Sequence, residues 1–178
     1  MKAFKKYALI LLALLICLAA LAVLLVIYVK TPKFRLASVT VNNLSFTNTA
    51  NSASFDISLE ADYAVRNPNF FPFEYRSSEV AFSYRGKTVG KGLVGEGKAT
   101  PLSTKEGGLG VRLSSRAFSA GSGLGRDIGN GRVSLSVGSE LRGKVDFVKM
   151  MKRSRTPEMS CTMVVNLADK VVQNLKCD

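Results

Sequence analysis

The sequence contains no histidine. This absence removes the general base of the Ser-His-Asp and Cys-His mechanisms and the commonest zinc ligand. A glycosidase would need only two carboxylates, and Asp56, Glu60 and Asp62 lie close together in the sequence. They alternate with apolar residues, however, as the solvated positions of a strand do. We therefore predict that the protein is not an enzyme, and we assign no catalytic, cofactor-binding or metal-ligating residue.

Acidic residues are scarce. The chain has 13 Asp and Glu against 25 Lys and Arg, for a formal net charge of +12. From Lys30 onward, 22 basic residues face all 13 acidic ones, a net charge of +9. Such a domain attracts anions, and those it meets outside the cytosol are lipid headgroups and acidic polysaccharides, not nucleic acid. The predicted partner class is an anionic surface.

Cysteine is scarce too. Cys17 lies in an apolar stretch, which leaves Cys161 and Cys177 near the C-terminus. In a domain that passes through an oxidising compartment, such an even pair favours a disulfide. Its loop of about 17 residues would contribute on the order of 3 kcal/mol to stability. Two buried free thiols are the alternative.

An uncharged run of 23 residues, from Tyr7 to Val29, follows three lysines. As a helix it would extend roughly 34 Å and span the ~30 Å bilayer core. We predict a cytosolic head (1–6), a transmembrane helix (7–29) and one extracytoplasmic domain (30–178), since a short basic head favours a signal anchor. A cleaved signal peptide is the alternative, because Ala20-Leu21-Ala22 resembles a cleavage site, although the apolar run continues beyond it.

The remainder of the chain has the two-residue periodicity of β-strands. From Phe55 to Val65 every odd position is apolar or aromatic, while every even position from Ser54 to Asp62 is polar. Similar but shorter patterns contain Leu36 to Phe46 (loosely spaced), Val80 to Tyr84, Leu109 to Leu113, Val133 to Val137, Val145 to Phe147 and Met163 to Leu167. About seven short strands separated by turns predict an all-β fold, a single antiparallel β-sandwich of the fibronectin-III or immunoglobulin type.

Turn residues punctuate this pattern. Asn67-Pro68-Asn69 ends the longest strand, because proline cannot donate to the ladder and asparagine accepts turn conformations. Gly86-Lys87 fits a two-residue hairpin with glycine at the first central position. The glycines from Gly90 to Gly97 predict an edge strand that is bulged or weakly packed. The glycine-rich stretch from Ser119 to Gly131 is either a short helix or an open loop.

Two surface features are candidate sites. Lys149, Lys152, Arg153 and Arg155 place four cations in seven residues, and we interpret them as a loop that is either merely solvated or in contact with an anionic glycan or lipid. Asn43-Leu44-Ser45 is an acceptor sequence for N-glycosylation, although its closeness to the predicted membrane predicts partial occupancy.

The order of several segments resembles a known family. These segments are YVKTPKF (28–34), VRNPNFFPFEY (65–75), SYRGKTVGKG (83–92) and SCTMVV (160–165), followed by Cys177. Together they resemble the plant late embryogenesis abundant group-two domain, and more narrowly its membrane-anchored harpin-induced and non-race-specific disease resistance branch. The family motif falls on Asn67, Pro68 and Asn69, which we interpret as a structural turn.

The resemblance implies a fibronectin-like sandwich at the plasma membrane or in the secretory pathway, without catalysis or cofactors, and with roles in defence and abiotic stress. Two functions remain open. The first is a membrane-tethered interaction domain acting through membrane, wall or protein partners. The second is a tethered binding module for a lipid or a small apolar ligand.

Overall fold

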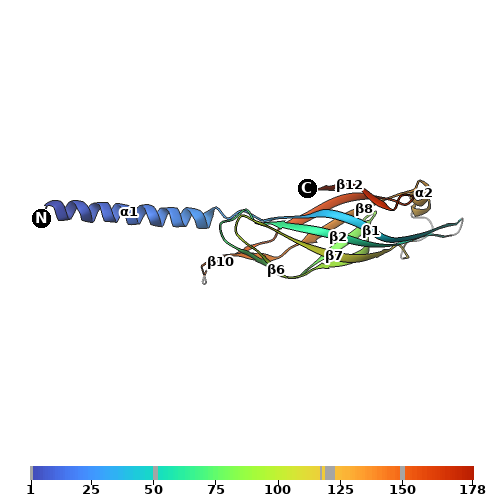
Figure 1. Ribbon diagram of the computed structural model, residues 1–178, viewed down its shortest axis with the longest axis horizontal. Coiled ribbons are helices and arrows are strands. Elements are labelled where there is room, and N and C mark those ends of the chain that lie inside the picture. The colour runs from blue at the N-terminus through green and yellow to red at the C-terminus, as the bar shows by residue number, and fades with distance from the viewer. Residues whose placement is uncertain (1, 50–51, 117, 119–122, 149–150) are drawn as a thin grey trace. The chain divides into compact units, whose positions relative to one another are not determined.

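The computed structural model describes residues 2–49, 52–116, 118, 123–148 and 151–178, and the chain divides into two compact units, Met1–Lys30 and Thr31–Asp178. The first unit contains helix α1 (Lys2–Ile27), drawn in blue in Figure 1. The stretch Lys5–Leu24 of this helix has a mean hydropathy of 3.0, and none of it is buried. The predicted apolar helix is therefore confirmed. Its length and composition suit both a membrane span and a signal sequence, so its retention stays a prediction.

The second unit is built from antiparallel strands, which form three sheets in the described part of the chain. The first sheet has the order β1-β2-β7 and comprises β1 (Lys33–Thr49), β2 (Ser52–Arg66) and β7 (Thr104–Ser114). The second has the order β12-β11-β8-β4-β5 and comprises β4 (Ser78–Tyr84), β5 (Lys87–Val94), β8 (Arg132–Glu140), β11 (Glu158–Asn166) and β12 (Val171–Cys177). The third has the order β10-β9-β3-β6 and comprises β3 (Phe73–Tyr75), β6 (Gly97–Ala99), β9 (Gly143–Val148) and β10 (Met151–Arg155).

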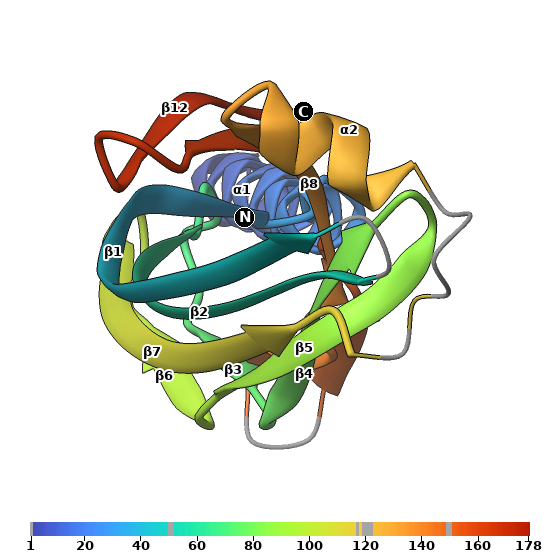
Figure 2. The same cartoon turned by 90° about the vertical axis from the view of Figure 1, so that its right-hand side faces the viewer.

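The core lies between the first and second sheets. The alternation of β2 places Phe55, Ile57 and Leu59 inside, each no more than 2% exposed. At the margins, β5 contacts β7 (Figure 2), and β1 contacts β11 and β12. The two sheets therefore enclose these side chains. The predicted all-β antiparallel class is confirmed, whereas the fibronectin or immunoglobulin type stays a prediction.

The loose spacing of the first strand has a cause in its pairing. The register between β1 and β2 shifts between Leu36 and Ser38, and again between Val41 and Asn43. Each bulge inserts a residue and moves the apolar positions from even to odd numbers or back. Leu36 and Leu44 are both even-numbered and both buried, because the second register shift reverses the first.

The turn after β4 differs from the prediction by one position. The central residues are Arg85 and Gly86, both with positive φ (47° and 79°), and β5 already begins at Lys87. Positive φ at both positions is the type I′ pattern, whose twist matches that of the flanking strands. Glycine thus occupies the second central position, because Arg85 accepts the left-handed conformation at the first.

The predicted edge strand is present, for β5 ends the order of the second sheet, and its pairing with β4 has a register shift between Phe82 and Ser83, as a bulged edge would. The alternative of weak packing is wrong, because the glycines of β5 allow close packing. A Cβ atom on Gly90 would lie 2.5 Å from the carbonyl oxygen of Arg112, and one on Gly92 would lie 2.5 Å from Cδ1 of Leu109. Both neighbours belong to β7, so the absence of side chains lets the two sheets approach along this margin.

The structure shows a short helix in the glycine-rich stretch and a strand in the basic stretch. In the glycine-rich stretch, residues 124–129 form the short helix α2 (Leu124–Gly129), with Leu124 and Ile128 buried, while 119–122 lie outside the described residues. The basic stretch predicted as a loop is strand β10, paired with β9. Its sequence shows no apolar alternation because its side chains are largely exposed, and strand pairing alone makes it a strand.

Candidate functional site

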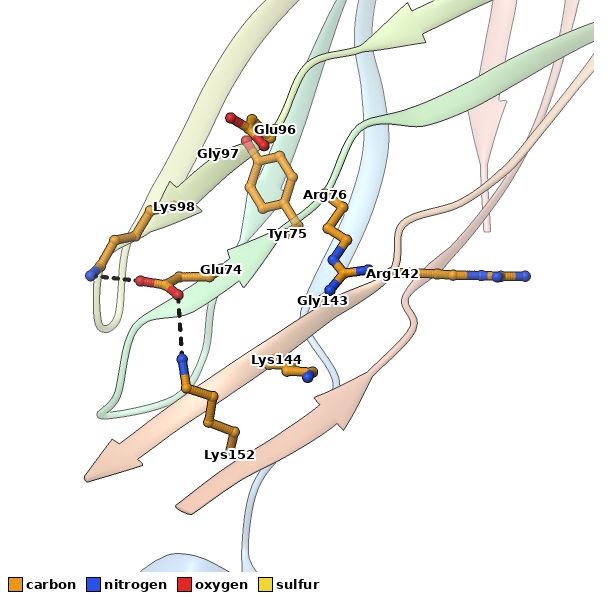
Figure 3. Close-up of a pocket in the computed structure, with 10 residues that line it drawn as sticks. All are labelled: Glu74, Tyr75, Arg76, Glu96, Gly97, Lys98, Arg142, Gly143, Lys144 and Lys152. Carbon is orange, nitrogen blue, oxygen red and sulfur yellow. Dashed lines mark hydrogen bonds and ion pairs between the residues drawn. The ribbon is translucent and has the colours of Figure 1, made fainter. Parts of the chain in front are cut away.

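An open groove of about 860 Å³ lies over the third sheet. Strands β3, β6, β9 and β10 all contribute to it, and Figure 3 shows their side chains around the hollow. Its lining consists of Glu74, Tyr75, Arg76, Glu96, Gly97, Lys98, Arg142, Gly143, Lys144 and Lys152. Five cationic side chains and two carboxylates give this lining an excess of three positive charges.

Strand register places the charges of the groove in a row. Glu74 on β3 is the Cα partner of Lys98 on β6 and of Lys144 on β9. Opposite charges directly across a strand pair attract one another. Oε1 of Glu74 lies 3.0 Å from Nζ of Lys98, and Oε2 lies 4.0 Å from Nζ of Lys152. The single carboxylate therefore holds two lysines that approach from opposite sides (Figure 3).

The carboxylates in and beside the groove do not pair with all of its cations. Lys152 also pairs with Asp146 at 3.1 Å, and Arg142 lies 3.7 Å from Glu140. In the described part of the chain, Arg76 and Lys144 take part in no ion pair of 4.0 Å or less. These two side chains supply the charge that an incoming anion would meet.

Tyr75 is a buried residue in the lining of the groove. Burial, followed by the neighbouring Tyr63, raises the pKa of Tyr75 from 10.0 to about 12, so the phenol is neutral at physiological pH. A Cβ atom on Gly97 would lie 2.5 Å from the Tyr75 hydroxyl oxygen, and one on Gly143 would collide with the ring of Phe73. The glycines on both neighbouring strands thus admit the aromatic rings of β3.

The structure distributes the predicted cationic cluster. Lys152 lines the groove, whereas Arg153 and Arg155 lie on β10 without lining it, and Lys149 lies outside the described residues. Neighbouring residues of a strand point to opposite faces, which separates Lys152 from Arg153. The sequence reasoning missed Arg76, Lys98, Arg142 and Lys144, because they come from three separate segments and only the register between β3, β6 and β9 brings them together.

The predicted disulfide is present. Cys161 on β11 and Cys177 on β12 are direct Cα partners and are joined, while Cys17 is free. The bond ties down β12, an edge strand whose residues are exposed or half-buried. The glycosylation candidate Asn43 lies exposed on β1, opposite Ser58, and its modification stays a prediction.

The Asn67-Pro68-Asn69 motif forms a hydrogen-bonded corner. The Asn67 side chain is fully buried, and its Nδ2 lies within hydrogen-bond distance of the carbonyl oxygens of Phe71 (2.8 Å), Ala99 (3.2 Å) and Thr100 (3.1 Å). Its Oδ1 accepts hydrogen bonds from the backbone and side-chain nitrogens of Asn69. A buried amide with these partners satisfies backbone groups of two loops, which supports our interpretation of the motif as structural.

No metal site is apparent in the chemistry of the described residues. Nowhere among them do three or more Cys, Asp or Glu side chains gather so that they could hold a metal ion. The groove instead offers lysine and arginine, which bind carboxylate, sulfate or phosphate groups.

Comparison with known proteins places the chain. The family model described as late embryogenesis abundant protein (LEA_2) matches residues 62–163. A late embryogenesis abundant protein of Arabidopsis thaliana is 26% identical over 178 residues, which cover 97% of this chain and 81% of that protein.

Two solved structures show only a distant likeness. A crystal structure of a protein from Archaeoglobus fulgidus aligns with a TM-score of 0.40 and 16% identity, over 71% of this chain and 94% of the other. A solution structure of an Arabidopsis thaliana protein aligns with a TM-score of 0.37 and 16% identity, over 75% and 82%. These scores are too low to support an argument. The family model, in contrast, covers more than half of the residues, and the chain therefore belongs to the late embryogenesis abundant protein family LEA_2.

Proposed function

We propose that the protein is a non-enzymatic, membrane-anchored member of its family that acts in stress or defence responses at the plant cell surface, and that its groove binds anionic surface groups. The observation that carries the proposal is the cationic excess of the groove. The anions are the carboxylates of wall polysaccharides or the phosphates of lipid headgroups, which share the chemistry that Lys and Arg recognise.

The anchoring part rests on α1. Its apolar, unburied length suits a bilayer, and the disulfide between Cys161 and Cys177 suits a domain that folds in an oxidising compartment. Both favour a single-pass protein with its C-terminal unit outside the cytosol, at the plasma membrane or in the secretory lumen. The resemblance to the harpin-induced and non-race-specific disease resistance branch agrees with this placement.

The binding part rests on Arg76 and Lys144. In the described structure no carboxylate lies within 4.0 Å of either cation, while Lys98 and Lys152 are held in place by Glu74. Because Lys98 and Lys152 are positioned in this way, they lose less side-chain freedom on binding an anion than isolated lysines would. The charged lining of the groove does not favour the alternative module for an apolar ligand, and protein partners stay open.

The test is a binding measurement on the full-length protein in nanodiscs of neutral lipid. We expect it to bind polygalacturonate or vesicles containing phosphatidylserine, with an affinity that falls as salt is added, because screening acts over about 8 Å at physiological ionic strength. The double variant Arg76→Gln, Lys144→Gln should bind much more weakly. The two ligands distinguish polysaccharide from lipid as the source of the anion.

A matched control removes the same net charge elsewhere. Arg112 on β7 and Arg132 on β8 are exposed, and neither lines the groove. The variant Arg112→Gln, Arg132→Gln should retain most of the binding. Equal losses in both variants would mean that the overall charge attracts anions without a site, and the groove would then have no role.

A further inference from the structure

We propose that one end of the second unit, formed by the loops 67–72 and 100–103, dips two apolar side chains into the bilayer in which α1 is anchored. This inference rests on the anchoring part of the proposed function. It adds a second membrane contact, made by the folded domain itself. The end is defined by strand register, since Lys33, Arg66 and Thr104 are aligned across β1, β2 and β7, and we name it the Lys33 end.

Both loops of the Lys33 end expose a large apolar side chain. Phe70 is 67% exposed and Leu102 is 62% exposed. Asn67, at the base of the first loop, is by contrast fully buried. A single exposed apolar residue is ordinary on a protein surface, whereas two on adjoining loops offer a candidate contact surface.

Hydrogen bonds hold the two tips together. The backbone nitrogen of Leu102 donates to the carbonyl oxygen of Asn69 at 3.0 Å, and that of Asn67 donates to the carbonyl oxygen of Ser103 at 2.8 Å. Nδ2 of Asn67 bridges further to Thr100. Phe70 follows Asn69 directly and Leu102 is itself one of the bonded residues, so these hydrogen bonds place the backbones of both exposed residues at one corner.

The backbone at Leu102 is strained. Its φ of +52° lies in the left-handed region, which leucine rarely adopts and which glycine or asparagine would occupy at less cost. Strain of this kind persists where the surrounding structure enforces it, and it clusters at functional positions. A leucine held there gains nothing from the core, because it is exposed. Its side chain suits an apolar medium outside the protein.

Chain connectivity identifies that medium as the bilayer. Five residues separate Ile27, where α1 ends, from Lys33, where β1 begins, and this connection reaches at most about 20 Å even when fully extended. Whatever orientation the two units adopt, the Lys33 end therefore stays close to the surface of the membrane that holds α1. The opposite end of β1 is separated from Lys33 by the whole length of the strand.

Charge complements the apolar tips. Lys33 and Arg66 are exposed Cα partners, and like charges directly opposite one another repel. Lys105 on β7 adds a third exposed cation beside them. The acid nearest to this end on β7 is Glu106, one residue further along the strand. Anionic headgroups would relieve the repulsion, and apolar tips flanked by Lys and Arg are typical of interfacial membrane contacts.

The absence of tryptophan makes the test direct. Full-length variants Phe70→Trp and Leu102→Trp each carry a single tryptophan and are reconstituted into nanodiscs of phosphatidylcholine and phosphatidylserine with brominated acyl chains. We expect quenching and a blue-shifted emission for both. Phe46→Trp is the matched control, because Phe46 is 49% exposed near the opposite end of β1. It should show neither effect.

The outcomes separate this inference from the proposed function. If the discs retain the protein but Phe70→Trp behaves like Phe46→Trp, the inference is overturned while the anchor stands. If the protein is not retained in discs and is released from membranes by alkaline carbonate, both fail. As a check independent of tryptophan, Phe70→Cys in a Cys17→Ser background should react more slowly with a water-soluble maleimide in discs than Phe46→Cys does. Equal rates would contradict the inference.

Discussion

Strands β12 and β10 are both sheet edges, but they are held by different means. Strand β12 is joined to β11 by the Cys161–Cys177 disulfide, and the backbone nitrogen of Asp178 donates to the carbonyl oxygen of Ser160 at 3.0 Å. Strand β10 is paired with β9 and is tied by Lys152 to Asp146 and Glu74. Neither strand buries a continuous apolar face. The difference teaches that one edge is fixed covalently, while the other depends on charges that salt and anions can reach.

The largest expected effect is the loss of the covalent edge. The variant Cys161→Ser, Cys177→Ser should lower the free energy of unfolding by about 3 kcal/mol, the value that the chain-entropy model gives for a loop of this size. Urea denaturation of full-length protein in detergent measures it. The control Cys17→Ser removes the thiol of the free cysteine and should leave stability unchanged. An unchanged midpoint in the double variant would show that β12 is held by its backbone ladder alone.

The second-largest expected effect is a loss of stability at high pH. It acts on the sheets of both edges and would reduce the difference between them. The hydroxyl of Tyr84 donates to Oδ2 of Asp127 at 2.6 Å, and its pKa is raised from 10.0 to about 12 by burial and then by that hydrogen bond. Tyr84 belongs to the sheet that contains β12, and Tyr75, with a pKa also raised to about 12, to the sheet that contains β10.

The folded protein loses stability at high pH, because it holds the two tyrosine protons more tightly than the unfolded chain does. The unfolded chain gives up these protons near pH 10, whereas the folded one holds them to about pH 12, so stability is full below pH 10 and is lost as the pH rises toward 12. Tyr84→Phe should cost roughly 2 kcal/mol at neutral pH, because it removes a hydrogen bond to a carboxylate. It should also flatten the alkaline loss, which denaturation midpoints between neutral pH and pH 12 would reveal. A variant that still loses stability as steeply as wild type would contradict the assignment.

The smallest effect concerns the charged edge. Lys152→Gln should cost less than about 1 kcal/mol, since its pairs are exposed to solvent and screened. Hydrogen exchange sharpens the comparison: added salt should speed exchange of the β10 amides and leave those of β12 unchanged. Arg112→Gln, a change of an exposed cation outside the groove, is the control and should alter neither strand. Equal salt sensitivity at both edges would remove the distinction between them.

Sequence patterns predict the elements whose side-chain environment depends on residues close together in the sequence. The alternation from Phe55 to Val65 predicted β2 because every second side chain meets the core. The pair Cys161 and Cys177 predicted the disulfide because they are an even pair, close together near the C-terminus, in a domain expected to pass through an oxidising compartment. The patterns mislead where strand pairing decides the outcome. They predict a loop where β10 lies, and they place the hairpin turn one residue too late.

By itself, the sequence determined the apolar helix, the antiparallel β class and the disulfide, since each depends on the spacing of residues along one or two segments. Only the tertiary structure decided which charges share the groove, because Arg76, Lys98 and Lys144 meet through the register of three strands. It also decided that Phe70 and Leu102 share one end of the domain. The pairing of Arg66 with Thr104 and hydrogen bonds across 33 residues, such as that from Asn67 to Thr100, bring the two loops together, and neither leaves a periodic trace in the sequence.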